Sequence, residues 1–259
     1  MKRRLALCLP VAPHDIEAAM HLAHLWADIE PAFNADVEVI IALRFDMQKE
    51  QIPDDVIKHL ETKFFKVHVI VSNLKGVGFP HGCNSLEIGA YGWFVERARD
   101  GSIKADYMMI AESDTIPLRP TWIKEIIKEV YDAQAPIMGI WWSQGEGYPH
   151  INGNCLMHKD FWRQCTAIWQ VPPYNGWDCY IAKTSLSIGK PSRLMWQDYH
   201  LGLPENPWKG DEFLFDFRQY KSPDNPLYGE KLQPAFLHGI KTLQGIDAVR
   251  KRYNLARRV

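Results

Sequence analysis

An apolar run ends in two carboxylates and a turn in the stretch Tyr107-Met-Met-Ile-Ala-Glu-Ser-Asp-Thr-Ile-Pro117. Residues 107–111 predict a buried strand, so Glu112 and Asp114 stand just beyond its carboxyl end. Two carboxylates two residues apart at such an end can share one divalent cation, because Mg²⁺ and Mn²⁺ take oxygen ligands in proteins. A solvated acidic turn is the simpler alternative.

This strand belongs to a regular alternation of strands and helices. Continuous apolar runs predict further strands at 5–11, 37–43, 67–71 and 137–142. Helical spacing of apolar residues, together with start signals, predicts helices at 15–29, 54–64, 84–99 and 122–133. The order is typical of a doubly wound α/β fold with a mostly parallel sheet flanked by helices.

Ligands of such folds bind beyond the carboxyl ends of the strands. Asp46, the glycine-rich loop at Gly82 and Asp114 follow predicted strands, and the pair Trp141-Trp142 ends one, so we expect them to border one crevice. Adjacent residues of a strand point to opposite faces. At most one tryptophan of the pair therefore faces the crevice.

The second half of the chain is less regular. Helices are expected at 159–169 and 177–186, and a long loop region at 204–234. The tail at 250–258 contains five basic residues. We expect one domain over residues 1–259, divided into residues 1–118, residues 119–241 and a basic tail (242–259).

Composition narrows the function less than the motifs do. The 259 residues have a net charge of −1 and an isoelectric point near 6.8, which demands neither a nucleic-acid nor a membrane partner. Five cysteines without a CxxC pair argue against a disulfide framework or a zinc site, and favour a cytoplasmic protein. No apolar stretch approaches the length of a membrane span.

Three segments, taken together, resemble the GT-A glycosyltransferases. The stretch around Asp114 resembles their Asp-x-Asp region. The segment His150-Ile-Asn-Gly-Asn-Cys-Leu-Met-His-Lys-Asp-Phe161 is similar to the strand beside the acceptor, and Phe236-Leu-His-Gly-Ile-Lys241 to the C-terminal metal-binding segment. Their order and spacing, over residues 5–241, carry the resemblance. The chain departs from the pattern at Glu112, where the family has Asp, so the contact of Glu112 with metal or ribose stays open.

The resemblance implies a nucleoside-diphosphate sugar donor and a Mn²⁺ or Mg²⁺ cofactor. It makes residues 1–118 the nucleotide-binding half and residues 119–241 the acceptor half. Asp114, His238 and Glu112 are then the metal ligands, and Lys241 contacts the diphosphate. Asp178 is the candidate general base of an inverting enzyme. The alternatives are a core histidine for His238, a solvated lysine for Lys241 and a helix N-cap for Asp178.

The remaining site residues follow from topology and from the resemblance. The residues expected at the nucleotide sugar are Pro10, Val11, Asp46, Gly82, Asn84 and Ser113. The residues expected at the acceptor are Trp142, Asn152, Gly153, Asn154 and Trp177. Ordinary turn residues, helix caps and core aromatics are the simpler interpretations of these positions.

The acceptor and the reaction class leave alternatives. Small GT-A-like enzymes of DNA phages add sugars to hydroxymethylated pyrimidines, and a base in DNA is one candidate acceptor; a saccharide of a surface glycan is the other. A nucleotidyltransferase is disfavoured, because the loop Val11-Ala-Pro-His-Asp15 lacks glycine, lysine and arginine. A non-catalytic carbohydrate- or nucleotide-binding protein would need neither the metal carboxylates nor a base.

Overall fold

The computed structural model describes residues 2–142, 149–198, 208–220 and 233–256. Within these residues the larger sheet has seven strands in the order β3-β2-β1-β4-β7-β6-β8. They are β1 (Leu5–Val11), β2 (Asn34–Leu43), β3 (Phe64–Val71), β4 (Tyr107–Ile110), β6 (Ile137–Trp142), β7 (His150–His158) and β8 (Lys190–Pro191). Strands β1 to β4 run parallel, as predicted.

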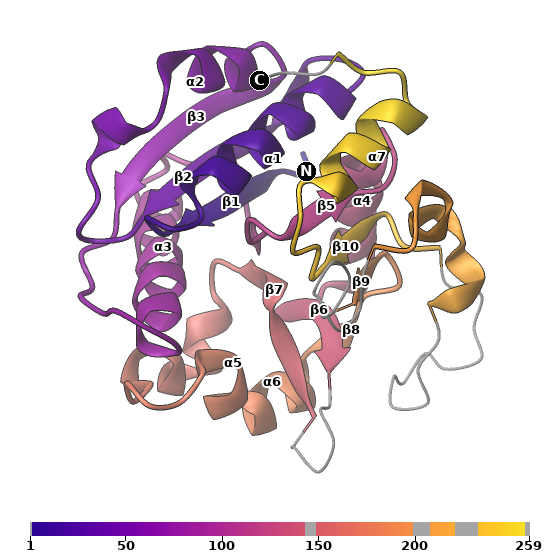
Figure 1. Cartoon of the computed structure of the whole chain (residues 1–259). Coiled ribbons are helices and arrows are strands. Elements are labelled where there is room, and N and C mark those ends of the chain that lie inside the picture. The colour runs from indigo at the N-terminus through magenta and orange to yellow at the C-terminus, as the bar shows by residue number, and fades with distance from the viewer. Residues whose placement is uncertain (1, 143–148, 199–207, 221–232, 257–259) are drawn as a thin grey trace.

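Strand β7 was not predicted as a neighbour of β4. It lies antiparallel between β4 and β6, so these two strands are not adjacent in the sheet. The segment that the sequence placed beside the acceptor is therefore a central strand. Because the pairing is antiparallel, the first residues of β7, which Figure 1 labels, lie at the carboxyl end of β4.

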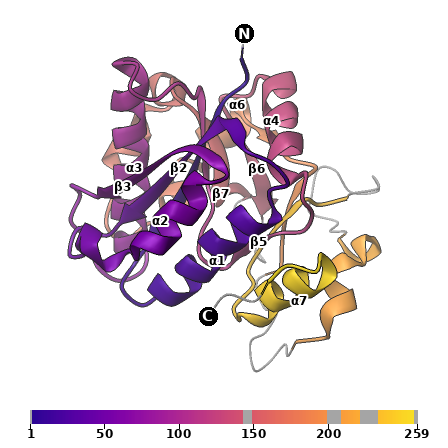
Figure 2. The same ribbon diagram turned by 90° about the horizontal axis from the view of Figure 1, so that it is seen from above.

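Both faces of the sheet are covered, because the side chains of a strand alternate between them. Leu5, Leu7 and Leu9 of β1 face one hydrophobic core, whereas Ala6 and Cys8 face the other. The first core packs against α1 (Ile16–Ile29), α2 (Asp54–Glu61), α4 (Trp122–Ala133) and α7 (Gln244–Arg252). The second packs against α3 (His81–Arg99), α5 (Trp177–Tyr180) and α6 (Ala182–Ile188). Figure 2 shows α1 and α2 on one side of the sheet and α3 on the other.

A second, three-stranded sheet joins the C-terminal part of the chain to β4. It contains β5 (Thr115–Pro117), β10 (Phe236–His238) and β9 (Met195–Gln197). Strand β10 pairs antiparallel with β5, with His238 opposite Thr115, and parallel with β9. Since β5 begins directly after Asp114, this sheet brings the end of the chain to the end of β4.

Three expectations about helices were wrong or shifted. Residues 159–169 form two 3₁₀ turns, η2 (Phe161–Arg163) and η3 (Thr166–Gln170), instead of one helix. The backbone N–H of Trp162 donates to the hydroxyl of Tyr91, 3.3 Å away, and this tertiary contact replaces a helical hydrogen bond. The helix expected at 177–186 is divided into α5 and α6 at Ile181. Helix α3 begins at His81, so Asn84 lies in its first turn and does not cap it.

The long loop expected at 204–234 is described only in part. Its described residues form 3₁₀ turns η4 (Asp211–Phe215) and η5 (Phe217–Gln219), and a further turn, η1 (Lys49–Gln51), precedes α2. Residues 204–207 and 221–232 of this region, and Arg257 and Arg258 of the basic tail, lie outside the described residues. No helix in the described segments is long and apolar enough to cross a membrane.

Candidate functional site

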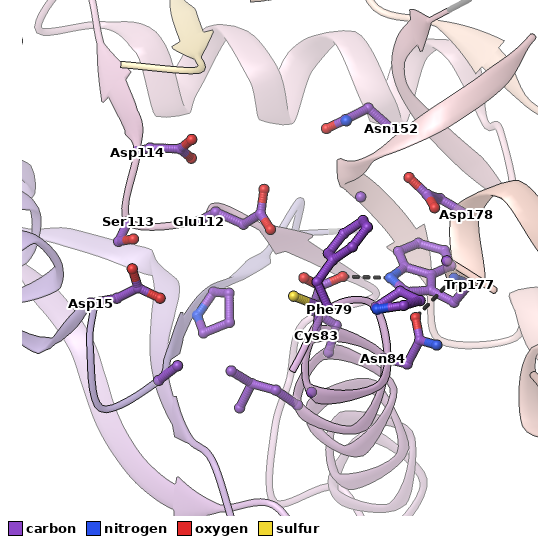
Figure 3. A pocket seen from close by; sticks show the side chains of 18 of the residues that line it. Asp15, Phe79, Cys83, Asn84, Glu112, Ser113, Asp114, Asn152, Trp177 and Asp178 are labelled. Atoms are coloured by element: carbon purple, nitrogen blue, oxygen red, sulfur yellow. Dashed lines mark hydrogen bonds between the residues drawn. The ribbon is translucent and has the colours of Figure 1, made fainter. Parts of the chain in front are cut away.

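A cavity of about 970 Å³ opens at the carboxyl ends of β1 and β4, between α3, α5 and the start of β7. Most of the predicted site residues line it. They are Pro10, Gly82, Asn84, Glu112, Ser113, Asp114, Trp142, Asn152, Gly153, Trp177, Asp178, His238 and Lys241. Figure 3 shows Glu112 and Asp114 on one side of this space and Asp178 and Trp177 on the other.

Glu112, Asp114 and His238 meet at the end of β4. The Nε2 atom of His238 lies 3.2 Å from a carboxylate oxygen of Glu112 and 3.2 Å from one of Asp114. The ammonium group of Lys241 forms an ion pair with the other oxygen of Asp114. The Nδ1 atom of His238 lies 3.2 Å from Oε1 of Gln197, which directs Nε2 toward the carboxylates.

The backbone explains how a distant segment reaches Asp114. The carbonyl oxygen of Asp114 accepts hydrogen bonds from the N–H groups of Gly239, at 3.0 Å, and Ile240, at 2.7 Å. Gly239 has a φ of 96°, which a residue with a Cβ atom rarely adopts. The glycine after His238 therefore lets the chain turn back onto Asp114, and this turn places Lys241 beside the same carboxylate.

The charges of this cluster depend on one another. Burial alone would raise the pKa of both carboxyls, but His238 lowers the pKa of Glu112. His238 and Lys241 together hold the pKa of Asp114 far below its ordinary value. Burial also opposes charge on His238, yet the two carboxylates raise its pKa to about 9. Two cationic side chains thus neutralise two anionic ones at neutral pH.

The donor set fits a hard divalent cation. One oxygen from each carboxylate and one imidazole nitrogen lie within 4.8 Å of one another. Carboxylate and imidazole ligands suit Mn²⁺ and, with more water, Mg²⁺. The imidazole must lose its proton to become a ligand. A cation would thus replace the positive charge that His238 supplies.

Asn154, which we expected at the acceptor, holds Glu112 instead. Its side-chain amide donates to the Glu112 carboxylate at 2.5 Å, and its Oδ1 accepts from the Glu112 N–H at 2.8 Å. Oδ1 of Asn152 in turn accepts from the backbone and side-chain N–H groups of Asn154. Asn154 is fully buried and does not line the cavity. The longer side chain of Glu112 is therefore fixed toward His238.

Asp178 stands on the opposite wall, in the first turn of α5. One of its carboxylate oxygens accepts from the N–H of Cys179 at 2.8 Å, and the other lies 3.6 Å from Nε2 of His150. Burial raises the pKa of Asp178; the charge of nearby Glu112 raises it further, whereas His150 lowers it. A carboxyl in this setting binds a proton more readily than one in water, as a general base requires.

Helix α3 holds the loop that carries Asp178. The side chain of Asn84 donates to the carbonyl of Asn175 at 2.6 Å and accepts from the N–H of Trp177 at 2.9 Å. The indole N–H of Trp177 donates to the Glu87 carboxyl. We call these contacts the α3–α5 clamp. Trp177 is 3% exposed, so its ring packs in the core more than it offers a stacking surface.

Two predicted nucleotide-binding residues do not reach the cavity. The side chain of Val11 packs into the core beneath α1, because the alternation of β1 directs it away from the site. Asp46 forms two hydrogen bonds of 2.7 Å with Arg44 outside the cavity. Arg44 lines the cavity, so it is the residue of that pair that a ligand would meet.

Sequence reasoning missed several residues of the cavity. In the sequence, Glu87 has the pattern of an ordinary charged residue on a helix surface. In the structure its side chain is 5% exposed, and burial raises its pKa well above the ordinary value. Asp15, read as a helix cap, lines the cavity near Asp114. Phe79 and Tyr174 line it too and are 89% and 79% exposed. Their position between glycines and prolines was the available signal.

Comparisons with known proteins agree with this architecture. No family model and no curated protein sequence matches the chain. Among solved structures, it is similar to the glycosyltransferase GlyE of Streptococcus pneumoniae TIGR4, with a TM-score of 0.53 at 12% identity. That alignment covers 94% of this chain and 56% of GlyE, so the chain spans little more than half of its length. Mouse xyloside xylosyltransferase 1 aligns with a TM-score of 0.50 at 12% identity, over 92% of this chain and 98% of that protein.

These likenesses concern the fold. The chain has the GT-A-like architecture that the sequence predicted, with a mostly parallel sheet between two helical layers. At this level of identity the reaction and the substrates have to be argued from the cavity itself.

Proposed function

We propose that the chain is a metal-dependent glycosyltransferase that moves a sugar from a nucleoside diphosphate to a hydroxyl group. The observation that carries the proposal is the convergence of Glu112, Asp114 and His238 at the end of β4, with Lys241 beside Asp114. A divalent cation held there stabilises the negative charge of a departing diphosphate. The proposal is supported by the position of the cluster beyond the carboxyl end of β4, because α/β folds of this kind bind ligands beyond the carboxyl ends of their strands.

The residues around the cluster have separable roles in the proposal. Lys241 contacts a diphosphate oxygen as a point charge. Pro10 and Arg44 line the cavity at the ends of β1 and β2, and in the proposal they contact the nucleoside. Asn154 keeps Glu112 aimed at the cation, so it supports the metal site without contacting the substrate.

Asp178 is the proposed general base. Its carboxylate accepts the proton of the acceptor hydroxyl while the oxygen forms a bond to the anomeric carbon and the bond from that carbon to the diphosphate breaks. Such a single displacement inverts the anomeric configuration. The position of Asp178 across the cavity from Asp114, which Figure 3 shows, matches attack opposite the leaving group.

The acceptor is proposed to carry its hydroxyl next to a flat apolar face. Phe79 and Tyr174 offer exposed rings at the cavity, and both a sugar ring and a flipped base can stack on such rings. A 5-hydroxymethylpyrimidine in DNA and a saccharide therefore both meet this requirement. The basic residues of α7 give DNA no added support, because Arg250, Lys251 and Arg252 pair with acidic residues of the chain.

The test is a screen of nucleotide sugars for donor hydrolysis and transfer, with Mn²⁺, Mg²⁺ or EDTA. We expect activity with one donor class, loss of that activity in EDTA, and loss of it in Asp114→Asn. Full activity in EDTA would remove the metal from the proposal. If the protein binds a donor but turns it over under none of these conditions, it is a binding protein. If it releases pyrophosphate from a nucleoside triphosphate, it is a nucleotidyltransferase.

The same assay distinguishes the acceptors. Duplex DNA containing 5-hydroxymethylcytosine or 5-hydroxymethyluracil is compared with free oligosaccharides, using the donor that the protein hydrolyses. Transfer to the modified DNA, and none to unmodified DNA, identifies the base as acceptor. Labelled oligosaccharide with unlabelled DNA identifies the saccharide. The anomeric signal of the product in a proton NMR spectrum then shows whether the configuration is inverted.

A further inference from the structure

Three potential metal ligands meet on the acceptor wall of the cavity, apart from the cluster at Asp114. His150 begins β7, and Asp178 and Cys179 lie in the first turn of α5. An imidazole nitrogen, a carboxylate oxygen and the Cys179 sulfur lie within 4.8 Å of one another. The spacing of the cysteines in the sequence gave no sign of this group, because the fold brings His150 to residues 28 and 29 positions later.

The chemistry of this group differs from that of the Asp114 cluster. Its nitrogen, oxygen and sulfur ligands suit Zn²⁺ and Co²⁺, whereas Mg²⁺ and Mn²⁺ favour oxygen. All three residues line the cavity, and Cys179 is exposed, so an ion reaches the group from solvent. Three protein ligands leave a fourth tetrahedral position open to water.

We propose that His150, Asp178 and Cys179 form a second metal site, selective for zinc-like ions. Binding forms a bond from the metal to the Cys179 sulfur, and the thiol proton passes to solvent. The three ligand atoms already lie within 4.8 Å of one another, and Nε2 of His150 lies 3.6 Å from the Asp178 carboxylate, so the group is assembled before a metal binds.

An ion at this site inhibits sugar transfer. This part of the inference rests on the proposed function, because the inhibition arises from the carboxylate of Asp178. A metal-bound carboxylate no longer accepts the proton of an acceptor hydroxyl. Mn²⁺ in excess does not relieve the inhibition, since it binds the oxygen-rich cluster across the cavity.

The first experiment measures binding alone and needs no catalytic activity. Co²⁺ is titrated into the full chain, and the near-ultraviolet absorption of a cobalt–thiolate bond is recorded. We expect this band in the unmodified protein and in Cys83→Ser, the matched control, because Cys83 is also an exposed thiol of the same cavity. The band is expected to be absent in Cys179→Ser, and His150→Ala is expected to weaken Co²⁺ binding at least about tenfold.

Several results would overturn the site. They are a missing band in the unmodified protein, a band that persists in Cys179→Ser, or a band lost in Cys83→Ser. Alkylation of the unmodified protein by iodoacetamide, read by mass spectrometry, needs no variant that has to fold. Zn²⁺ is expected to protect Cys179 and not Cys83, and equal labelling of Cys179 with and without Zn²⁺ would also overturn the proposal.

The second experiment tests the inhibition. Transfer is measured at saturating Mn²⁺ with increasing Zn²⁺, and each variant is compared with its own rate without Zn²⁺. We expect Cys179→Ser to need at least about ten times more Zn²⁺ for half inhibition than Cys83→Ser does. A cobalt band without inhibition would retain the site and reject the role of Asp178. Inhibition of equal strength in both variants would place the inhibitory ion elsewhere.

Discussion

Asp178 is the residue at which the proposed reaction is tested most directly. Asp178→Asn keeps the size of the side chain and its ability to accept the Cys179 N–H, but it removes the proton acceptor. We expect turnover to fall by roughly a hundredfold or more, with donor affinity retained. Steady-state transfer and donor titration measure the two quantities. Asp160→Asn, outside the cavity, is the control; an unchanged rate in Asp178→Asn would leave Asp178 as a helix-terminal residue only.

The same substitution has an opposite effect on stability. Burial raises the pKa of Asp178 in the folded protein, so the fold favours the protonated carboxyl. The ionised form therefore lowers the stability at pH values above that raised pKa, and this cost disappears as the pH falls toward the ordinary value of an Asp. We expect Asp178→Asn to have the higher Tm at pH 8, with a difference that shrinks toward pH 4. A constant difference across this range would contradict the electrostatic origin.

In the proposed metal site, His238 is expected to make metal binding depend on pH. The carboxylates raise its pKa to about 9, so below that pH a metal ion has to displace a proton from the imidazole. Glu112 and Asp114 have lowered pKa values and stay ionised in this range. We expect Mn²⁺ affinity to rise by up to about tenfold per pH unit between pH 6.5 and 8.5. Titration followed by the electron paramagnetic resonance of free Mn²⁺ measures it; a pH-independent affinity would exclude His238 as a ligand.

At the scale of elements, the α3–α5 clamp fixes the position of α5, and with it the wall of the cavity that carries Asp178. Trp177→Phe keeps an aromatic ring but leaves the buried Glu87 carboxyl without its indole donor. We expect a loss of about 1–3 kcal/mol in unfolding free energy, and a raised KM for the acceptor with little change in donor affinity. Urea unfolding and kinetics measure both effects. Trp169→Phe, on a ring stacked over Tyr91 outside the cavity, is the control, and equal effects of the two changes would argue against the clamp.

The close approach of these elements also explains a glycine. A Cβ atom on Gly153 would lie 3.3 Å from the Glu87 carboxylate and 4.0 Å from the Trp177 ring. Gly153 was expected to contact the acceptor directly. A side chain at this position would press on the α3–α5 clamp. Because glycine has no side chain, β7 can lie against α3 and α5.

Some helices and strands could be predicted from their own sequence, and others could not. Local patterns predicted β1, β2, β4, β6 and α4, because each is an uninterrupted apolar or periodic run. Local patterns did not reveal the 3₁₀ turns after β7, where the hydroxyl of Tyr91 competes for the Trp162 N–H. The site residues differ in the same way. Asp114 was predictable because it directly follows an apolar strand. Glu87 and His150 were not, because they belong to the site only through contacts with residues about 90 and 28 positions away in the chain.

At the scale of the whole molecule, α7 fastens the C-terminal part of the chain to α1. The guanidinium of Arg250 lies 2.6 Å from the Asp28 carboxylate, and both side chains are almost fully buried. Removal of residues 250–259 would therefore break this buried contact and disturb the fold. A loss of DNA binding in such a truncated protein could not be attributed to the lost basic charge alone. Arg250, Lys251 and Arg252 of the predicted basic tail belong to α7, and Tyr253 and Leu255 after it still pack against the core.

Point substitutions in α7 separate structure from surface charge. Arg250→Ala removes the guanidinium from the buried Asp28 carboxylate, and we expect a loss of about 3 kcal/mol in unfolding free energy. Arg252→Ala, whose exposed partner Glu212 lies 3.7 Å away, should cost at most about 1 kcal/mol. Urea unfolding measures both; equal losses would contradict the importance of burial.

The pairing of β5 with β10 has a consequence for synthesis. Lys241 follows Asp114 by 127 residues, so a ribosome adding about 5–20 residues per second needs about 6 to 25 s between them. During that interval the nascent chain has two neighbouring carboxylates without the imidazole and ammonium groups that later neutralise them. Until β10 docks, water or a divalent ion is left to stabilise these two carboxylates, which the completed fold partly buries beside His238 and Lys241.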